Sequence, residues 1–135
     1  MPGAATQGYQ RPDTPAAQYR SGLQALGEHV KNAFNGKSFS QLSPRDQDEV
    51  LAGLESGSIT LNDVNGARFF ELMLANTMEG FFADPIYGGN RDMAGWKLIG
   101  FPGARYDYRD WVERHNEPYP LPPVSILGRS EWEVK

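Results

Sequence analysis

Apolar side chains recur every three or four positions over the first part of the chain, which is the pattern of an amphipathic helix. One face of this helix would carry Tyr19, Leu23, Leu26, Val30 and Phe34. Its start is marked by a capping residue, Asp13 or Thr14, followed by Pro15 in the first turn. Asn35-Gly36 favours the left-handed conformation that ends a helix. The sequence therefore predicts a helix from about Thr14 to Phe34.

A second helix is predicted to begin directly after Ser43. Ser43 can cap this helix, Pro44 suits the first helical position, and Asp46 can complete a capping box. The helical pattern ends by Gly57. Its apolar positions form only a short stripe, made of Val50, Leu51 and Leu54. Because this stripe is short, we expect the helix to pack as a lid on the others.

A third helix is predicted from Asn62 or Asn65 to Phe82. Its apolar residues point almost all round the helix and include Phe69, Phe70, Leu72, Met73, Leu74, Met78 and Phe81. Such a distribution is typical of a helix that is covered on most sides. We expect it to be the central helix, with these side chains in the core.

The sequence changes character near residue 80. Six glycines between residues 80 and 103 are interleaved with large aromatic residues, which flexible linkers do not carry at this density. This segment is therefore predicted to be a fixed loop. A short helix is expected within Arg105 to His115, and four prolines between residues 118 and 123 favour an extended, polyproline-like strap.

The predicted fold class is mainly α. It comprises a small helical domain of about three main helices, a Gly- and aromatic-rich ordered loop, and a Pro-rich C-terminal strap. Residues 1–13 are predicted to form a flexible arm. Residues 14–135 are predicted to form a single domain, with a helical part at 14–82 and the loop and strap at 83–135. The total of 135 residues is the size of one ordinary domain.

Charge and cysteine content exclude several classes of function. The chain has 13 basic and 17 acidic residues, a net charge of −4, and no basic run, so nucleic acid is not an expected partner. It has no cysteine, which excludes disulfides, thiol catalysis, iron–sulfur clusters and covalent attachment of a c-type haem. No stretch approaches the roughly 18 consecutive apolar residues of a membrane span, so no direct span is expected.

The strongest candidate for chemistry is the loop from Asp84 to Met93. Gly88-Gly89 can adopt positive φ and lets a ligand or another backbone approach closely, while Asp84, Asn90, Arg91 and Asp92 supply donors and acceptors. These residue types build a recognition loop, but local bonding of side chains to the backbone also explains them, and this favours a structural loop. The loop matches no dinucleotide-binding, P-loop or EF-hand pattern. No catalytic, cofactor-binding or metal-binding residue is predicted.

The same loop carries a resemblance to a known family. GFFADPIYGGNRDMAGWK at residues 80–97 and IGFPGA at residues 99–104 resemble the signature of the gluconate 2-dehydrogenase subunit 3 family. Tyr108, Trp111 and the Pro-rich close are also similar to the family, whereas the first half agrees only in being helical. The resemblance implies a small, non-catalytic subunit of an oxidoreductase complex, one that carries no cofactor of its own.

The resemblance also implies partners and a location. A separate FAD-dependent subunit of the glucose-methanol-choline type would oxidise the sugar or sugar acid, and a cytochrome c subunit with haem c would take the electrons. The small subunit would support the folding, export or stability of the flavoprotein, and members usually carry a twin-arginine signal. Residues 1–19 contain no Arg-Arg followed by an apolar stretch. The expected location is the periplasm, with association with the membrane through the complex.

Two hypotheses follow for the loop. In the first, the loop and the strap from Tyr119 to Ile126 contact the flavoprotein, with Tyr87, Arg91 and Trp96 as anchors, because such residues often dominate interfaces. In the second, the Asp84 to Asp92 loop is the site of a stand-alone enzyme or of a module that binds a sugar or sugar acid. The predicted set, either partner-contacting or structural, is Asp84, Tyr87, Gly88, Gly89, Asn90, Arg91, Asp92 and Trp96.

Overall fold

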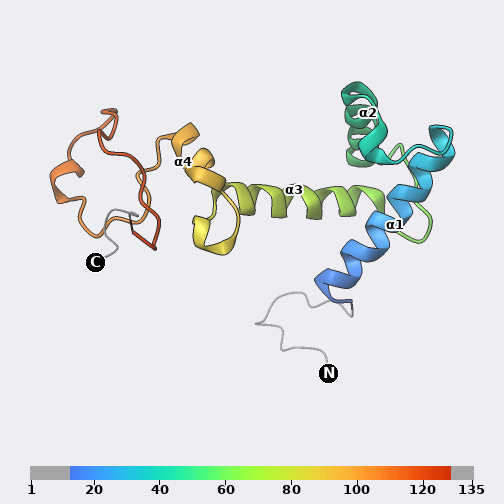
Figure 1. Ribbon diagram of the computed structural model, residues 1–135, viewed down its shortest axis with the longest axis horizontal. Helices are drawn as coiled ribbons and strands as arrows, with labels where there is room; N and C mark the ends of the chain where they lie inside the picture. Colours follow the sequence, from blue (N-terminus) through green and yellow to red (C-terminus); the bar gives the residue numbers. More distant parts are fainter. Residues whose placement is uncertain (1–12, 129–135) are drawn as a thin grey trace. The chain divides into compact units, whose positions relative to one another are not determined.

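The computed structural model describes residues 13–128, and the chain divides into two compact units. The first unit ends at Met73 and the second begins at Leu74, so one helix contributes to both. Figure 1 shows the four α-helices of the described residues, which are α1 (Pro15–Ala33), α2 (Pro44–Glu55), α3 (Gly66–Phe82) and α4 (Ala94–Ile99). The mainly α class is confirmed. The expected arm lies outside the described residues except for Asp13, and the single domain at 14–135 stays a prediction.

The ends of α1 are fixed by the local sequence signals that predicted them. The Thr14 side chain accepts a hydrogen bond from the Ala17 amide at 3.2 Å, and Pro15 occupies the first turn. Beyond the helix, Asn35 and Gly36 both have positive φ, at 52° and 82°. The predicted N-cap and left-handed stop are therefore confirmed.

Side-chain caps also fix the starts of α2 and α3. The Ser43 hydroxyl accepts from the Asp46 amide at 3.2 Å and donates to the Asp46 carboxylate at 2.8 Å, which makes a short capping pair. At α3, the Asn65 side-chain oxygen accepts from the Arg68 amide at 3.0 Å. Of the two predicted starts, Asn65 is the one that caps the third helix.

The hydrophobic core lies entirely in the first unit. Its buried members are Ala25, Leu26, Val30, Leu42, Val50, Leu54, Leu61 and Phe69. The expectation that α2 is merely a lid is wrong, because Val50 and Leu54 are among the least exposed side chains described. The short apolar stripe is enough to anchor α2 in the core, because its few apolar side chains are buried there.

One glycine sets how closely α1 approaches α3. Gly22 is buried, and a Cβ atom at this position would overlap the ring of Phe69. The same ring meets Tyr19 edge-on, with 6.0 Å between the ring centroids. Phe69 therefore occupies space that only a residue without a side chain leaves free.

Three expectations about the rest of the chain need correction. In α3, only Gly66 and Phe69 are buried, so the second half of this helix is not covered on most sides. The helix expected within Arg105 to His115 is a single 3-10 turn at Arg109–Trp111. The helix α4 was not predicted, because its six residues are too short to show a hydrophobic period.

Replacing Gly22 by alanine is expected to lower the free energy of unfolding by about 1–3 kcal/mol, because the new methyl group forces the Phe69 ring from its site. Urea denaturation followed by circular dichroism measures this change. Gly27→Ala is the matched control on the same helix, where a Cβ meets nothing within 4 Å, and it should gain about 0.5–1 kcal/mol. Equal stability of the two variants would contradict this packing role.

Candidate functional site

The C-terminal end of α3 is closed by the loop that follows it. The last carbonyl groups of a helix have no partner within the helix, so they must find donors elsewhere. Here the carbonyl of Gly80 accepts from the Asn90 amide at 2.8 Å, and that of Phe82 accepts from Trp96 Nε1 at 2.7 Å. The Asn90 side-chain amide donates to the Ala83 carbonyl at 2.8 Å. We call this arrangement of residues 80–96 the helix-end cap.

Asn90 is the centre of the helix-end cap. Its side chain is buried, and both ends of its amide group form hydrogen bonds. Besides the bond donated to Ala83, the amide oxygen accepts from the Gly95 backbone amide at 2.8 Å. It holds a left-handed conformation with φ 44°, which Asn tolerates better than most residues. One asparagine thereby joins the end of α3 to the start of α4.

Two glycines let the loop pass directly against the helix end. A Cβ atom on Gly89 would overlap the carbonyl of Gly80, and one on Gly95 would overlap the carbonyl of Phe81. Both obstacles are backbone atoms and cannot move aside as the tip of a side chain would. These positions therefore require glycine for close approach.

Asp84 connects the start of the loop to a segment about forty residues later. One carboxylate oxygen accepts from the Ile86 amide at 3.0 Å and from the Ser125 hydroxyl at 2.8 Å. The other accepts from the Ile126 amide at 2.8 Å. We call this group of contacts the Asp84 latch. Both Asp84 and Ser125 are buried.

The latch determines the protonation of Asp84. Burial by itself raises the pKa of the Asp84 carboxyl, because it disfavours the charged form. The hydrogen bonds from Ile86, Ile126 and Ser125 stabilise the carboxylate and outweigh burial, so the pKa lies below its ordinary value of 3.8. Asp84 is therefore charged at neutral pH and acts as an acceptor, not as an acid.

Contacts from Gly103 and Arg105 fix the C-terminal strap. Gly103 pairs with Val124 in an isolated parallel bridge, and the Tyr108 hydroxyl donates to the Gly103 carbonyl at 2.7 Å. The Arg105 guanidinium donates to the Pro122 carbonyl and lies over the ring of Tyr119, 5.2 Å from its centroid. Arg105, Tyr119 and Val124 border a pocket of about 300 Å³, and the Arg105 guanidinium holds the strap there.

The predicted loop residues fall into two groups. Asp84, Gly89, Asn90 and Trp96 point inward and bond or pack within the second unit, whereas Tyr87, Gly88, Arg91 and Asp92 are exposed. Arg91 and Asp92 approach each other only to 3.9 Å, with almost fully exposed side chains. Trp96 is 5 % exposed and packs edge-on against Phe101 at 5.1 Å between centroids. Trp96 is therefore packed inside the second unit, unlike the exposed Tyr87 and Arg91 that were predicted as anchors with it.

The second unit leaves most of its large apolar side chains exposed. Among the described residues, its buried large hydrophobics are Trp96 and Val124. Fourteen others are exposed, namely Leu74, Met78, Phe81, Phe82, Ile86, Tyr87, Leu98, Ile99, Phe101, Tyr106, Val112, Leu121, Ile126 and Leu127. Leu23 is the single exposed counterpart in the described part of the first unit. The sequence predicted a contact surface in the loop and the strap, but it assigned the apolar residues of α3 to the core, including Met78 and Phe81, which are exposed.

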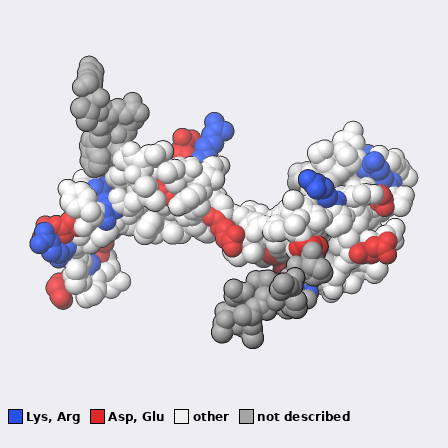
Figure 2. Space-filling view, turned by 90° about the horizontal axis from the view of Figure 1, so that it is seen from below, with Lys and Arg blue, Asp and Glu red and all other residues white. Residues whose placement is uncertain are grey.

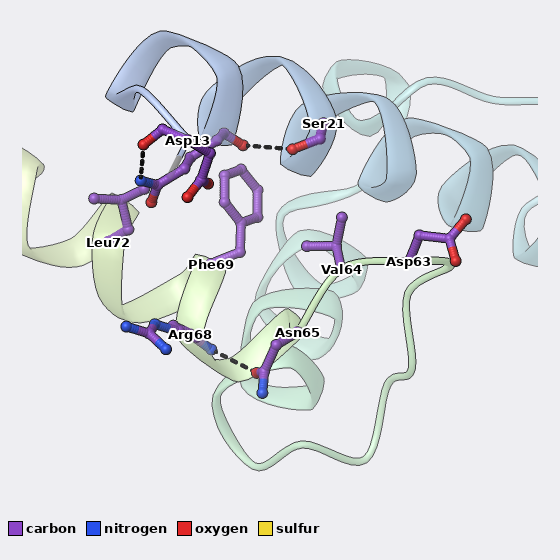
Figure 3. A pocket seen from close by; sticks show the side chains of 9 residues that line it. Asp13, Ser21, Asp63, Val64, Asn65, Arg68, Phe69 and Leu72 are labelled. Carbon is purple, nitrogen blue, oxygen red and sulfur yellow. Dashed lines mark hydrogen bonds between the residues drawn. The ribbon is translucent and has the colours of Figure 1, made fainter. Parts of the chain in front are cut away.

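A pocket in the first unit lies between α1 and the start of α3 (Figure 3). Its volume is about 170 Å³, below the roughly 300–1,000 Å³ of ordinary ligand sites. Polar groups around it bond to one another, since Gln18 donates to the Asp13 carbonyl at 3.3 Å and Ser21 to the Gln18 carbonyl at 3.2 Å. This pocket supports no ligand site.

Residues 13–128 were searched for metal-binding clusters and for membrane-spanning helices. No group of three or more His, Asp or Glu side chains there could hold a metal ion. None of the helices in this part combines the length and the hydropathy that crossing a membrane requires. On the face drawn in Figure 2, basic and acidic side chains are interspersed rather than gathered into a patch of one sign.

Comparison with known proteins now identifies the family. The model of the family described as gluconate 2-dehydrogenase subunit 3 matches residues 6–103, which is more than half of the chain. The chain belongs to the gluconate 2-dehydrogenase subunit 3 family. The match includes the whole helix-end cap of this subunit 3 member and ends at Gly103, where the strap pairs with it. No curated protein and no solved structure matches the chain.

Replacing Asn90 by alanine is expected to lower the free energy of unfolding of the second unit by about 2 kcal/mol or more, because two backbone groups lose their partners. Hydrogen exchange at the amides of residues 90–96 reports this loss. The neighbouring Arg91→Ala is the control, since its side chain is 97% exposed, and it should leave exchange unchanged. An Asn90→Ala protein with native protection would contradict the capping role.

Replacing Asp84 by asparagine is expected to weaken the latch by about 2 kcal/mol at pH 7, because hydrogen bonds to a charged acceptor are lost. The lowered pKa of Asp84 means that its contribution is complete above pH 3.8 and disappears as the pH falls through the folded-state pKa. The protection factor of the Ile126 amide, which is the ratio of its intrinsic to its observed exchange rate, should therefore fall in acid in the wild type. In Asp84→Asn it should be low already at pH 7.

The control for the latch is Asp92→Asn, the same substitution at an exposed carboxylate of the same loop. It should keep the protection of the Ile126 amide and the acid dependence of the wild type. An Asp84→Asn protein that behaves like this control would show that the latch does not hold the strap.

Proposed function

We propose that this chain is a non-catalytic small subunit of a periplasmic, FAD-dependent dehydrogenase complex of the gluconate 2-dehydrogenase type. Its role is to support the folding, export or stability of the catalytic flavoprotein subunit. Membership of the subunit 3 family implies partner subunits.

The observation that carries the proposal is the exposed apolar surface of the second unit. Apolar side chains that a folded unit leaves exposed in large number favour an interaction surface. The second unit combines fourteen exposed large apolar side chains with a tightly fixed backbone. A surface that is both apolar and rigid suits a permanent partner, because little conformational entropy is lost on binding.

The chemistry of the candidate loop supports a structural role over a catalytic one. Asp84 is charged and accepts three hydrogen bonds within the chain, and Asn90 uses both ends of its amide on the chain's own backbone. A general acid or base needs a group that is free to exchange a proton with a substrate. We therefore assign flavin and haem c chemistry to partner subunits, a flavoprotein of the glucose-methanol-choline type and a cytochrome c.

The test is co-purification from a host that expresses this chain with the dehydrogenase subunits encoded beside it. Affinity purification of the tagged chain should retain a yellow, FAD-containing subunit in stoichiometric amount. Without this chain, the yield of active flavoprotein should fall at least several-fold. A flavoprotein that reaches full activity and location in the absence of this chain would contradict the proposal.

A further inference from the structure

A pocket of about 300 Å³ lies between the segment that follows Gly103 and the strap. The residues that border it are Ala104, Arg105, Tyr106, Asp107, Tyr119 and Val124. Its volume is at the lower end of the range of ordinary ligand sites, so a small molecule or a single side chain fits it. The match to the family model ends at Gly103, so the pocket lies outside the matched residues. We call it the Arg105 pocket.

The Arg105 guanidinium is the unpaired charge of this pocket. Its Nη2 donates to the Pro122 carbonyl, whereas Nε is buried and has no hydrogen-bond partner in the described part of the chain. The ion pairs among residues 13–128 all join other side chains, so no described carboxylate neutralises Arg105. Native proteins pair most of their buried polar groups, and an exception calls for an acceptor such as a bound ion. The described residues give Arg105 a backbone acceptor but no anion.

The carboxylate that borders the same pocket is already occupied. Asp107 accepts from Arg109 Nε at 3.0 Å and from Arg109 Nη2 at 2.7 Å. It also accepts from the backbone amide of Arg109 at 3.0 Å. Such a two-pronged pair is among the stronger hydrogen-bonded arrangements of charged side chains. Because Arg109 compensates Asp107, the uncompensated charge at the pocket is positive.

The orientation of the Arg105 side chain is fixed by its neighbours. Its guanidinium lies over the ring of Tyr119, 5.2 Å from the centroid, and this ring packs edge-on against Trp111 at 4.9 Å between centroids. The bond to the Pro122 carbonyl adds a second point of attachment. A side chain that is already held in place loses little conformational entropy when a ligand binds. Arg105 is therefore a preorganised cation.

We propose that the Arg105 pocket binds a carboxylate, with the Arg105 guanidinium as its recognition group. Guanidinium N–H donors match the geometry of carboxylate oxygens. One unpaired cation balances the single charge of a carboxylate better than the charge of nearly two on a phosphate group. The rings of Tyr106 and Tyr119 border the pocket and suit a small apolar body next to the carboxylate.

The carboxylate can come from a small organic acid or from an acidic side chain of another protein, because both present the same group. The site belongs to this chain alone, so the inference does not depend on the proposed function. Binding to the purified chain tests the first, whereas co-purification of a flavoprotein tests the second.

The test titrates the purified full chain with benzoate and follows the NMR signals of Arg105 Nε–H and of the amides of residues 104–107. Benzoate should bind saturably. Benzamide has the same shape without the charge, so it should bind at least tenfold more weakly. The α-amide of N-acetylglutamic acid mimics an acidic side chain and is titrated in parallel. Tighter binding of this mimic assigns the site to a protein carboxylate, and tighter binding of benzoate assigns it to a small acid.

Two variants and a control locate the bound carboxylate. Arg105→Gln should weaken the binding of benzoate at least tenfold. Because Arg105 also holds the strap, Ala104→Leu provides a second variant that fills the pocket and keeps the guanidinium. It should weaken binding by a similar factor. Arg91→Gln removes the same charge from an exposed position in the same unit and should bind benzoate as the wild type does.

The outcomes decide the inference in both directions. Binding that falls in Arg105→Gln and Ala104→Leu but not in Arg91→Gln supports the site, and if Arg105→Gln does not fold, Ala104→Leu decides alone. The inference is overturned if neither benzoate nor the glutamate mimic saturates the wild type, or if benzamide binds as tightly as benzoate. Tighter binding of inorganic phosphate would also overturn it. Unchanged binding in Ala104→Leu would place the anion elsewhere on the surface and have the same consequence.

Discussion

The second unit depends on one requirement, which is that the last carbonyl groups of α3 find hydrogen-bond donors. Asn90 and Trp96 supply those donors, and the glycines at 89 and 95 let the loop come close enough to deliver them. This single constraint explains why a glycine-rich segment is nonetheless rigid. It also explains why an asparagine accepts a left-handed backbone, since its amide bonds repay the strain.

The sequence predicted those parts of the fold that rest on local chemistry. The caps at Thr14 and Ser43 and the stop at Asn35-Gly36 involve residues within a few positions of one another. The resemblance of residues 80–104 likewise found the family, because the close approaches at Gly89 and Gly95 restrict which residues fit. Helix caps and close backbone approaches each restrict which residues fit at particular positions, so both can be recognised in a single sequence.

The rest could not be predicted, because it depends on which way a side chain points after the chain has folded. Residue type placed Trp96 and Arg91 together as anchors, yet the indole turns inward to Phe82 while the guanidinium stays in solvent. The apolar residues of α3 are alike in sequence, but Phe69 is buried and Phe82 is exposed. Composition indicates that an apolar side chain is favoured in a buried position. It does not distinguish burial in the chain's own core from burial against a partner.

The Asp84 latch has a kinetic consequence. Its bond to Ser125 closes a loop of 41 residues, whereas the bond from Trp96 to the Phe82 carbonyl spans 14. Closing the longer loop costs roughly 1 kcal/mol more in chain entropy, by the logarithmic dependence on loop length. Contacts of shorter separation form faster on average. We therefore expect the end of α3 to form before the strap joins it, and the Asp84 carboxylate to close the second unit last.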